Sequence, residues 1–522
     1  MMNICASCLE RLRMPWLYWV VLAVSALLTP FAFAPYRLFW LMPLLLALLL
    51  LLTQIRPQYM VRSAYLWGLL AYTAQFYWID IALHNVAGLT QFFALPLTLL
   101  LPAYLALYPA MVFWLLEKFC LSQWLRLIAV FPMLWTLAEF ARERALTGFG
   151  WGATGYSQIA ESPLAGFVPI SGIHLVTLAT VLLAALLAAV ILSKKWIQRT
   201  VFLSAALVLL LLGEGLKHIS FTEPDGSKNS VALLQGNIEQ TLKWRPEIFA
   251  ETVQQYYNQV VQSHADIVIL PETAIPEMRQ NLPQGLLASF ATQAKRNGSD
   301  LAAGMAQYTA DGQGYLNAVV NLSAFDPDAE DNLPFYAKNH LVPFGEYIPL
   351  PAVTEWLYRQ MNIPLAGFSR GGAAQAPLLL GKQKVAFNIC YEDSFGDELI
   401  ASAKQASLLA NVSNMAWYGK SAAMDQHLQQ SQARALEMGR FMVRATNTGM
   451  TAVINPQGQV LALLPPDTQQ TLTAEIVGYR GQTPYMRLGG SIWLIGLLAC
   501  FLAALSVYGR YRRRALADEN LN

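Results

Sequence analysis

The chain carries few charged side chains. Asp, Glu, Lys and Arg make up 13% of its 522 residues, whereas they make up about 25% of an ordinary soluble domain. Hydrophobic residues reach 55%, and the formal net charge is only +2. A chain with so little charge and so much apolar surface is typical of membrane proteins. The small net charge also gives no reason to expect a nucleic-acid partner.

Cysteine and histidine are scarce as well, with five Cys and six His in the chain. Cys390 alone falls in the polar half of the sequence, so a disulfide framework is excluded there. Cys5 and Cys8 form a C-x-x-C, but no further metal ligand lies near them, and no paired-histidine spacing typical of a zinc site occurs. We therefore expect neither a metal ion nor any other cofactor.

Apolar stretches fill most of the first 218 residues. Each approaches the ~20 residues that cross a bilayer as a helix. The first resembles a secretory signal, but Pro35 directly after the small residues argues against cleavage, so we interpret it as an anchor. We predict an α-helical membrane bundle of about eight spans. They cover residues 14–34, 37–54, 63–83, 92–116, 125–141, 166–192, 199–215 and 488–508.

Basic residues between these stretches are distributed unequally. Three flank one side of the predicted bundle, namely Arg37, Arg142 and Arg144. Thirteen flank the other side, namely Arg11, Arg13, Arg56, Arg62, Lys118, Arg126, Lys194, Lys195, Arg199, Arg510, Arg512, Arg513 and Arg514. Because cytoplasmic loops are enriched in Lys and Arg, we expect both termini in the cytoplasm and the polar region on the outer side, in a periplasm-like compartment.

The polar region alternates short strand-like runs with helix-like stretches, which predicts an α/β layered domain. Residues 220–230 look like a linker before its first strand. We divide the chain into a seven-span bundle over 1–218, a catalytic domain over 219–487, a last span over 488–508 and a basic cytoplasmic tail over 509–522.

Three motifs at the ends of apolar runs could carry chemistry. Cys390 ends the run Val385–Ile389 and could act as a nucleophile once a base removes its proton. Glu272 follows Leu270 and Pro271, where burial would make it a better general base. Lys338 could stabilise the negative oxygen of a tetrahedral intermediate.

Three neighbours of these motifs are supporting candidates. The backbone N–H of Tyr391 is a natural second oxyanion donor, because it follows the nucleophile directly. We interpret Glu346 and Glu392 as carboxylates that hold Lys338 or shape the pocket. His340 and His427 raise the alternative of a catalytic Cys–His pair. The Glu and Lys motifs favour Glu272 as the base instead.

A Glu, Lys and Cys in this order resemble the nitrilase (carbon–nitrogen hydrolase) superfamily, which implies an αββα sandwich. A nitrilase-like domain between seven spans and a last one is similar to the bacterial apolipoprotein N-acyltransferase family. The similarity covers nearly the whole chain and includes these stretches: Leu234-Gln235-Gly236-Asn237-Ile238, Lys243-Trp244, Asn411-Val412-Ser413-Asn414 and Arg444-Ala445-Thr446-Asn447. Met415 and Gly150 depart from the family's usual Asp and Pro.

The resemblance implies acyl transfer in two steps. A phospholipid gives an acyl chain to Cys390, and the thioester passes it to the α-amine of a diacylglyceryl-cysteine at the N-terminus of an apolipoprotein. Glu272, Lys338 and Cys390 would be catalytic, with Trp244 and Trp417 as substrate contacts. We expect a monomer.

Two other functions stay open. One is a membrane-anchored carbon–nitrogen hydrolase (amidase) that acts on a small amide. The other is a non-enzymatic transporter or scaffold, against which the intact Glu272, Lys338 and Cys390 argue. Within the bundle, Glu139 and Arg142 predict either an ion pair or a contact with a lipid headgroup, and Trp114, Trp135 and Trp151 are candidate interface anchors.

Overall fold

The computed structural model describes residues 14–327, 332–359 and 367–519. Cys5, Cys8, Arg11 and Arg13 lie outside the described residues. The chain divides into two compact units, of which the first comprises Met1–Tyr77, Leu95–Ile219 and Leu488–Asn522. The second comprises Trp78–Ala94 and Ser220–Arg487. We refer to them as the helical unit and the α/β unit.

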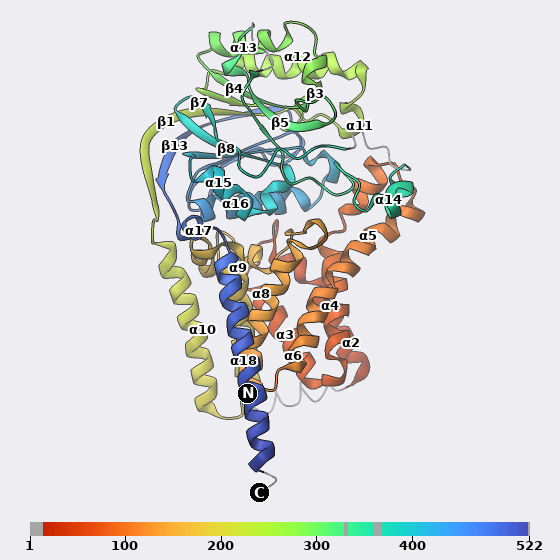
Figure 1. The fold of residues 1–522 in the computed structure, drawn as a ribbon, viewed down its shortest axis with the longest axis vertical. Helices are drawn as coiled ribbons and strands as arrows, with labels where there is room; N and C mark the ends of the chain where they lie inside the picture. The colour runs from red at the N-terminus through yellow and green to blue at the C-terminus, as the bar shows by residue number, and fades with distance from the viewer. Residues whose placement is uncertain (1–13, 328–331, 360–366, 520–522) are drawn as a thin grey trace. The chain divides into compact units, whose positions relative to one another are not determined.

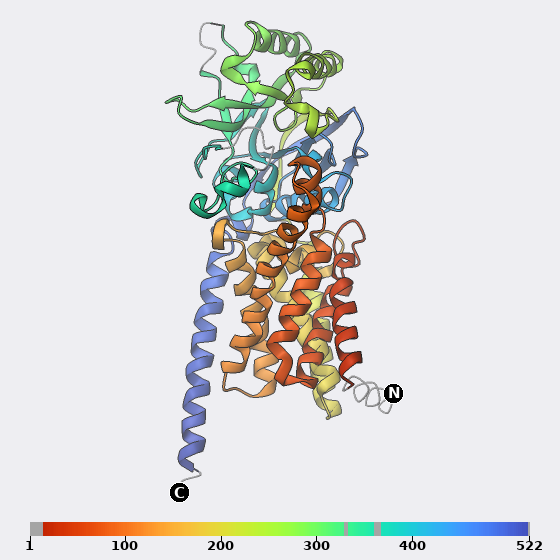
Figure 2. The same ribbon diagram turned by 90° about the vertical axis from the view of Figure 1, so that its right-hand side faces the viewer.

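The helical unit consists of packed helices, several of which lie side by side in Figure 2. They are α2 (Pro15–Leu27), α3 (Leu41–Ile55), α4 (Met60–Gln75), α5 (Gln91–Leu105), α6 (Leu107–Lys118), α8 (Phe131–Arg142), α9 (Val168–Leu192), α10 (Trp196–Lys217) and α18 (Ile492–Glu519). Within the described residues, six helices are long and apolar enough to span a membrane. The pair Leu41–Ile55 and Pro57–Gln75, bent by 115°, raises this to seven if it counts as one span. The count roughly fits the eight expected.

The structure contradicts the ion-pair interpretation of Glu139 and two of the three candidate interface anchors. Glu139 does not pair with Arg142 within the described part of the chain. Its carboxylate instead accepts hydrogen bonds from Thr154 N at 2.9 Å, Thr154 Oγ1 at 2.6 Å and Thr177 Oγ1 at 2.8 Å. These donors satisfy the carboxylate, so it needs no cation. Of the candidate interface anchors, Trp135 and Trp151 are buried, and only Trp114 is exposed.

The α/β unit is built on two sheets (Figure 1). The first has the order β13-β1-β2-β4-β5-β6, with β3 paired to β4. Its strands are β1 (Thr222–Gln235), β2 (Ile267–Ile269), β3 (Ile275–Met278), β4 (Asp300–Tyr308), β5 (Tyr315–Asn321), β6 (Phe335–Ala337) and β13 (Gln470–Gly481). The second has the order β12-β11-β10-β9-β8-β7. Its strands are β7 (Leu378–Leu380), β8 (Gln383–Ile389), β9 (Leu408–Ser413), β10 (Met442–Thr446), β11 (Ala452–Ile454) and β12 (Val460–Leu463).

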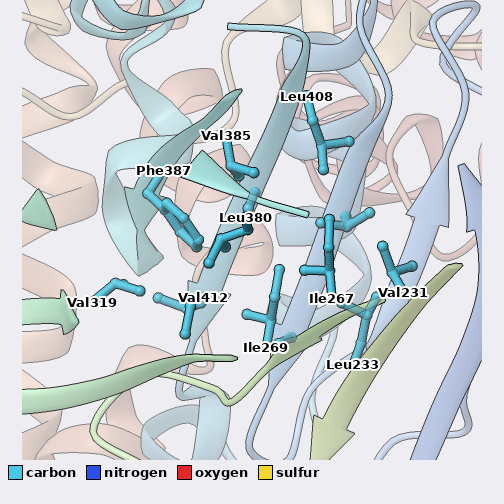
Figure 3. Packing of buried hydrophobic residues seen from close by; sticks show 14 of the residues in the cluster. Val231, Leu233, Ile267, Ile269, Val319, Leu380, Val385, Phe387, Leu408 and Val412 are labelled. Carbon is cyan, nitrogen blue, oxygen red and sulfur yellow. The ribbon is translucent and has the colours of Figure 1, made fainter. Parts of the chain in front are cut away.

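Three apolar cores make this unit an αββα sandwich. The central core lies between the two sheets and includes Ile267 and Ile269 from β2 together with Phe387 and Val412 from β8 and β9 (Figure 3). A second core packs the first sheet against α12 (Pro246–Gln262) and α13 (Leu286–Arg296). A third packs the other sheet against α15 (Gly396–Ala403), α16 (Ala423–Met438) and α17 (Pro484–Arg487). The expected α/β sandwich is therefore confirmed.

Two segments differ from their sequence-based interpretation. Residues 220–230 are no linker, because Thr222 already pairs with Gly481 and the ladder runs on to Gln235 opposite Gln470. Residues Trp78–Ala94, partly expected in the third span, belong to the α/β unit and include the helical turn η3 (Ile81–Val86). An α-helix cannot be told from such a turn by apolar composition alone.

Candidate active site

Cys390 lies where β8 ends and the short helix η11 (Cys390–Ser394) begins. Its φ of 51° is in the left-handed region, which a non-glycine residue adopts at a cost of about 1–3 kcal/mol. The residue is half-buried. Burial raises the pKa of the Cys390 thiol, and the Glu272 carboxylate raises it further, while Lys338 opposes the shift. The resting thiol therefore keeps its proton.

Glu272 lies on the turn that follows β2. Its Oε1 accepts from Asn317 Nδ2 at 2.8 Å, and its Oε2 accepts from the Asn414 backbone N–H at 2.8 Å. The turn fits tightly over β4, because a Cβ on Gly304 would lie 2.2 Å from the Pro271 carbonyl oxygen. The carboxylate is thus fixed from both sides and is 7% exposed.

Lys338 follows β6 and is 1% exposed. Its Nζ donates to Glu346 at 2.9 Å and lies 3.7 Å from Glu272 Oε1. Burial alone would lower the pKa of Lys338, but the negative charges of Glu346 and Glu272 outweigh it and raise the pKa. The side chain is therefore a permanent cation beside the thiol.

Glu392 connects the nucleophile turn to the Lys338 loop. One oxygen accepts from the Ile389 N–H at 2.7 Å and the Tyr336 hydroxyl at 2.9 Å. The other accepts from the N–H groups of Asn339 at 2.7 Å and His340 at 3.1 Å. Burial raises the pKa of Glu392 to about 7 against the lowering effect of these backbone donors. Glu392 thus holds the ends of two strands together and does not contact Lys338.

The structure brings some of the predicted site residues into contact with one another and leaves others outside this group. It brings Glu272, Lys338 and Glu346 into hydrogen-bond or ion-pair contact, and Glu272 and Lys338 act electrostatically on Cys390. Tyr391 is buried and packs edge-on against Phe395 with ring centroids 5.1 Å apart. The last two candidates, Trp244 after α11 (Gln240–Lys243) and Trp417 in η12 (Met415–Tyr418), are half-buried.

Sequence reasoning missed three residues of this site. Asn317 donates to both Glu272 and Glu346, at 2.8 and 3.1 Å, and so keeps the two carboxylates together. Burial raises the pKa of the Tyr418 phenol, and an ionised Cys390 would raise it further, so the phenol lies within electrostatic range of the sulfur. Trp78 packs edge-on against Tyr418, with ring centroids 4.7 Å apart. An Asn inside an apolar strand was the one available signal.

A second buried lysine, Lys243, lies beside the Glu272 turn. It is 2% exposed, and its Nζ donates to the Glu272 carbonyl oxygen at 3.1 Å. Burial lowers the pKa of Lys243 to about 8, although Glu272 and Cys390 oppose this shift. Lys243 therefore fixes the backbone of the Glu272 turn. The whole arrangement can pass a proton from a thiol to a carboxylate and stabilise an oxyanion with a nearby cation.

Comparisons with known proteins agree with this chemistry. Residues 230–485 match the family model of carbon-nitrogen hydrolase, and residues 25–186 match that of the apolipoprotein N-acyltransferase N-terminal domain. The apolipoprotein N-acyltransferase of Neisseria meningitidis serogroup B is 59% identical over 501 residues, which cover 95% of this chain and 96% of the relative. The protein of that name from Chromobacterium violaceum is 52% identical over 491 residues, 94% of each chain. That from Nitrosomonas europaea is 42% identical over 500 residues, 94% and 98% of the two chains.

Proposed function

Since the chain belongs to the apolipoprotein N-acyltransferase family and is a membrane enzyme of lipoprotein N-acylation, we propose that Cys390 carries the acyl group as a thioester. In this proposal Glu272 is the general base and Lys338 the oxyanion partner. The donor is a membrane phospholipid, and the acceptor is the α-amine of a diacylglyceryl-modified apolipoprotein. The observation that carries the proposal is the buried Lys338 Nζ, 3.7 Å from Glu272 and within electrostatic reach of Cys390.

The first half-reaction breaks an ester and forms a thioester. Glu272 takes the proton of the Cys390 thiol, and the sulfur attacks the ester carbonyl of the phospholipid. Lys338 and the Tyr391 backbone N–H stabilise the resulting oxyanion. When the intermediate collapses, the alkoxide of the lysophospholipid leaves and receives the proton from Glu272.

The second half-reaction breaks the thioester and forms an amide. The acceptor's amine attacks the acyl carbon, the same two donors stabilise the new oxyanion, and Glu272 takes a proton from the amine. The thiolate of Cys390 leaves and regains its proton from Glu272. Atoms and protons therefore balance without any cofactor.

The side of the membrane and the assembly state belong to the proposal as well. The excess of Lys and Arg at one side of the predicted spans supports an active site on the periplasmic side of the inner membrane. Glu272, Lys338 and Glu346 meet within a single copy of the chain, so the proposed chemistry needs no second copy and we propose a functional monomer.

The mass of the intact protein tests the proposal. Protein purified from membranes should carry one fatty-acyl increment that hydroxylamine removes, and Cys390→Ala should lack it. Addition of a peptide with a diacylglyceryl-cysteine N-terminus should discharge the thioester and make the peptide heavier by the same acyl mass. An N-acetylated version of the peptide should not react, because it has no free amine.

The rival carbon–nitrogen hydrolase predicts a different product. If lipid is consumed and only free fatty acid appears in the presence of the unblocked peptide, the acyl group ends on water. That result would replace the transferase proposal by the hydrolase.

A further inference from the structure

His427 lies beneath the nucleophile turn, although the proposed mechanism does not use it. It belongs to α16 and is fully buried. Its Nε2 lies 2.9 Å from the Cys390 carbonyl oxygen, and its Nδ1 lies 3.0 Å from Arg444 Nη2. The imidazole therefore bridges a cation on one side and the backbone of the nucleophile on the other.

These two contacts fix the protonation of the ring. An arginine guanidinium can only donate hydrogen bonds, so Nδ1 must accept from Arg444. Burial and the positive charge of Arg444 lower the pKa of His427 well below its ordinary value. The ring is therefore neutral with its one proton on Nε2, and this N–H donates to the Cys390 carbonyl. Asp393 Oδ2 lies 3.9 Å from Nε2, which is too far to accept that proton.

Arg444 is itself held in place by hydrogen bonds, so it gives His427 Nδ1 a fixed partner. Its Nη1 donates to Asp393 Oδ2 at 3.0 Å, and its Nε donates to the Met450 carbonyl oxygen at 3.3 Å. Asp393 also accepts from Asn388 Nδ2 at 2.6 Å and from the Ser431 hydroxyl. Arg444, Asp393, Asn388 and Ser431 are all at most 2% exposed. Buried networks with every partner satisfied are stiff.

The Cys390 carbonyl and the Tyr391 N–H belong to the same peptide plane. In a trans peptide these two groups point in opposite directions. A hydrogen bond that fixes the carbonyl on the α16 side thus also fixes the direction of the Tyr391 N–H. The φ of 51° at Cys390 means that the unrestrained peptide would favour another orientation.

We propose that His427 is a positioning residue that holds the Cys390–Tyr391 peptide so that the Tyr391 N–H faces the oxyanion. This inference rests on the proposed acyl transfer through Cys390. It assigns the network Asp393, Arg444 and His427 a role in aiming a backbone donor, not in moving protons.

Two substitutions separate positioning from folding. His427→Met fills a similar volume without a donor, and His427→Gln can place its amide nitrogen near the position of Nε2. The matched control is Gln432→Met on the same helix, because buried Gln432 donates to the Gly458 carbonyl at 2.7 Å, outside the nucleophile turn. Both methionine variants lose a buried polar contact, so thermal unfolding reports their structural cost.

The measurement is the rate at which Cys390 gains its acyl increment in a single turnover with excess phospholipid. We expect His427→Met to acylate about 10- to 100-fold more slowly, somewhat less than the loss of a whole oxyanion donor. We expect His427→Gln to recover most of that loss and Gln432→Met to match the wild type. The infrared carbonyl stretch of the trapped thioester should rise in His427→Met, since it loses a hydrogen bond there.

The outcomes distinguish this inference from the function on which it rests. If the wild type gains no acyl increment, the proposed function fails. If the wild type acylates and His427→Met acylates equally fast with an unshifted carbonyl stretch, the positioning role is wrong. Equal slowing of His427→Met and Gln432→Met, with equal loss of thermal stability, would reduce His427 to a structural residue.

Discussion

At the scale of single residues, the charges around Cys390 explain why the thiol needs a base. Lys338 is shared between Glu272 and Glu346, so the three side chains together carry one negative charge. A free thiolate beside them would add a second, with little solvent to screen it. In the proposed mechanism the proton therefore moves from sulfur to Glu272 as the carbonyl is attacked, so that Lys338 faces the oxyanion instead of a thiolate.

Removal of the Glu272 carboxylate or of the Lys338 ammonium group should greatly slow the acylation of Cys390. We expect Glu272→Gln and Lys338→Met each to lower the acylation rate by about two or more orders of magnitude. Glu277→Gln and Lys382→Met are matched controls, because Glu277 accepts from the neighbouring Met278 N–H and the Asn281 side chain and Lys382 is exposed. The rates would be measured with purified enzyme in phospholipid micelles. Near-normal turnover in either variant would remove that residue from the mechanism.

Glu392 should matter for stability as well as for rate. Its oxygens accept from four donors, and Glu392→Gln would put an N–H₂ group against two of them. An unsatisfied buried donor costs about 1–3 kcal/mol, so the thermal unfolding midpoint should fall. Glu398→Gln is the comparison, since Glu398 bonds the movable side chains of Asn339 and His340. Equal unfolding midpoints for the two variants would contradict the role of Glu392 in holding the two strand ends together.

At the scale of elements, the parts that sequence could predict are those with a local signature. Glu272, Lys338 and Cys390 each follow an apolar run, and the strand order of the sheets brings such ends together. Asn317 has no such signature, because its role depends on hydrogen bonds to Glu272 and Glu346, which are distant from it in the sequence. The polar start of β1 reads as a linker, and only its partner β13 makes it a strand. The π-helical turn after residue 80 likewise depends on its contacts in the α/β unit.

The turn after β2 offers a test at this scale. Gly304→Ala would press its Cβ against the Pro271 carbonyl oxygen and displace the Glu272 turn. We expect an activity loss of about 10-fold or more, since small misplacements of catalytic groups have large effects. Gly215→Ala in α10 is the control, because nothing lies within 4 Å of its added Cβ. An unchanged rate for Gly304→Ala would mean that this turn tolerates movement.

At the scale of the whole molecule, the chain combines a membrane unit with a nitrilase-like one. A soluble hydrolase needs at most one anchor, whereas two substrates with acyl chains reach the enzyme from within the lipid. Six or seven apolar helices fit that requirement. The proposed orientation of this unit in the membrane is supported only by the distribution of Lys and Arg between its loops.

Labelling from one side of the membrane tests this orientation. In a chain whose other cysteines are replaced by alanine, Gln457→Cys supplies an exposed thiol in the α/β unit. A membrane-impermeant thiol reagent should label it in spheroplasts and fail to label it in intact inverted vesicles. Labelling only in inverted vesicles would contradict the proposed periplasmic location of the α/β unit.

The pairing of β1 with β13 also constrains biosynthesis. These strands enter and leave the α/β unit, and Thr222 lies opposite Gly481 at one end of the ladder. The first sheet therefore lacks its edge strand β13 until the ribosome has made the chain through Gly481. Until then the unfinished strand offers unpaired amides to any neighbour. We therefore expect a nascent chain stalled before residue 470 to be inactive and prone to aggregate, and the span α18 to be made only after this sheet can close.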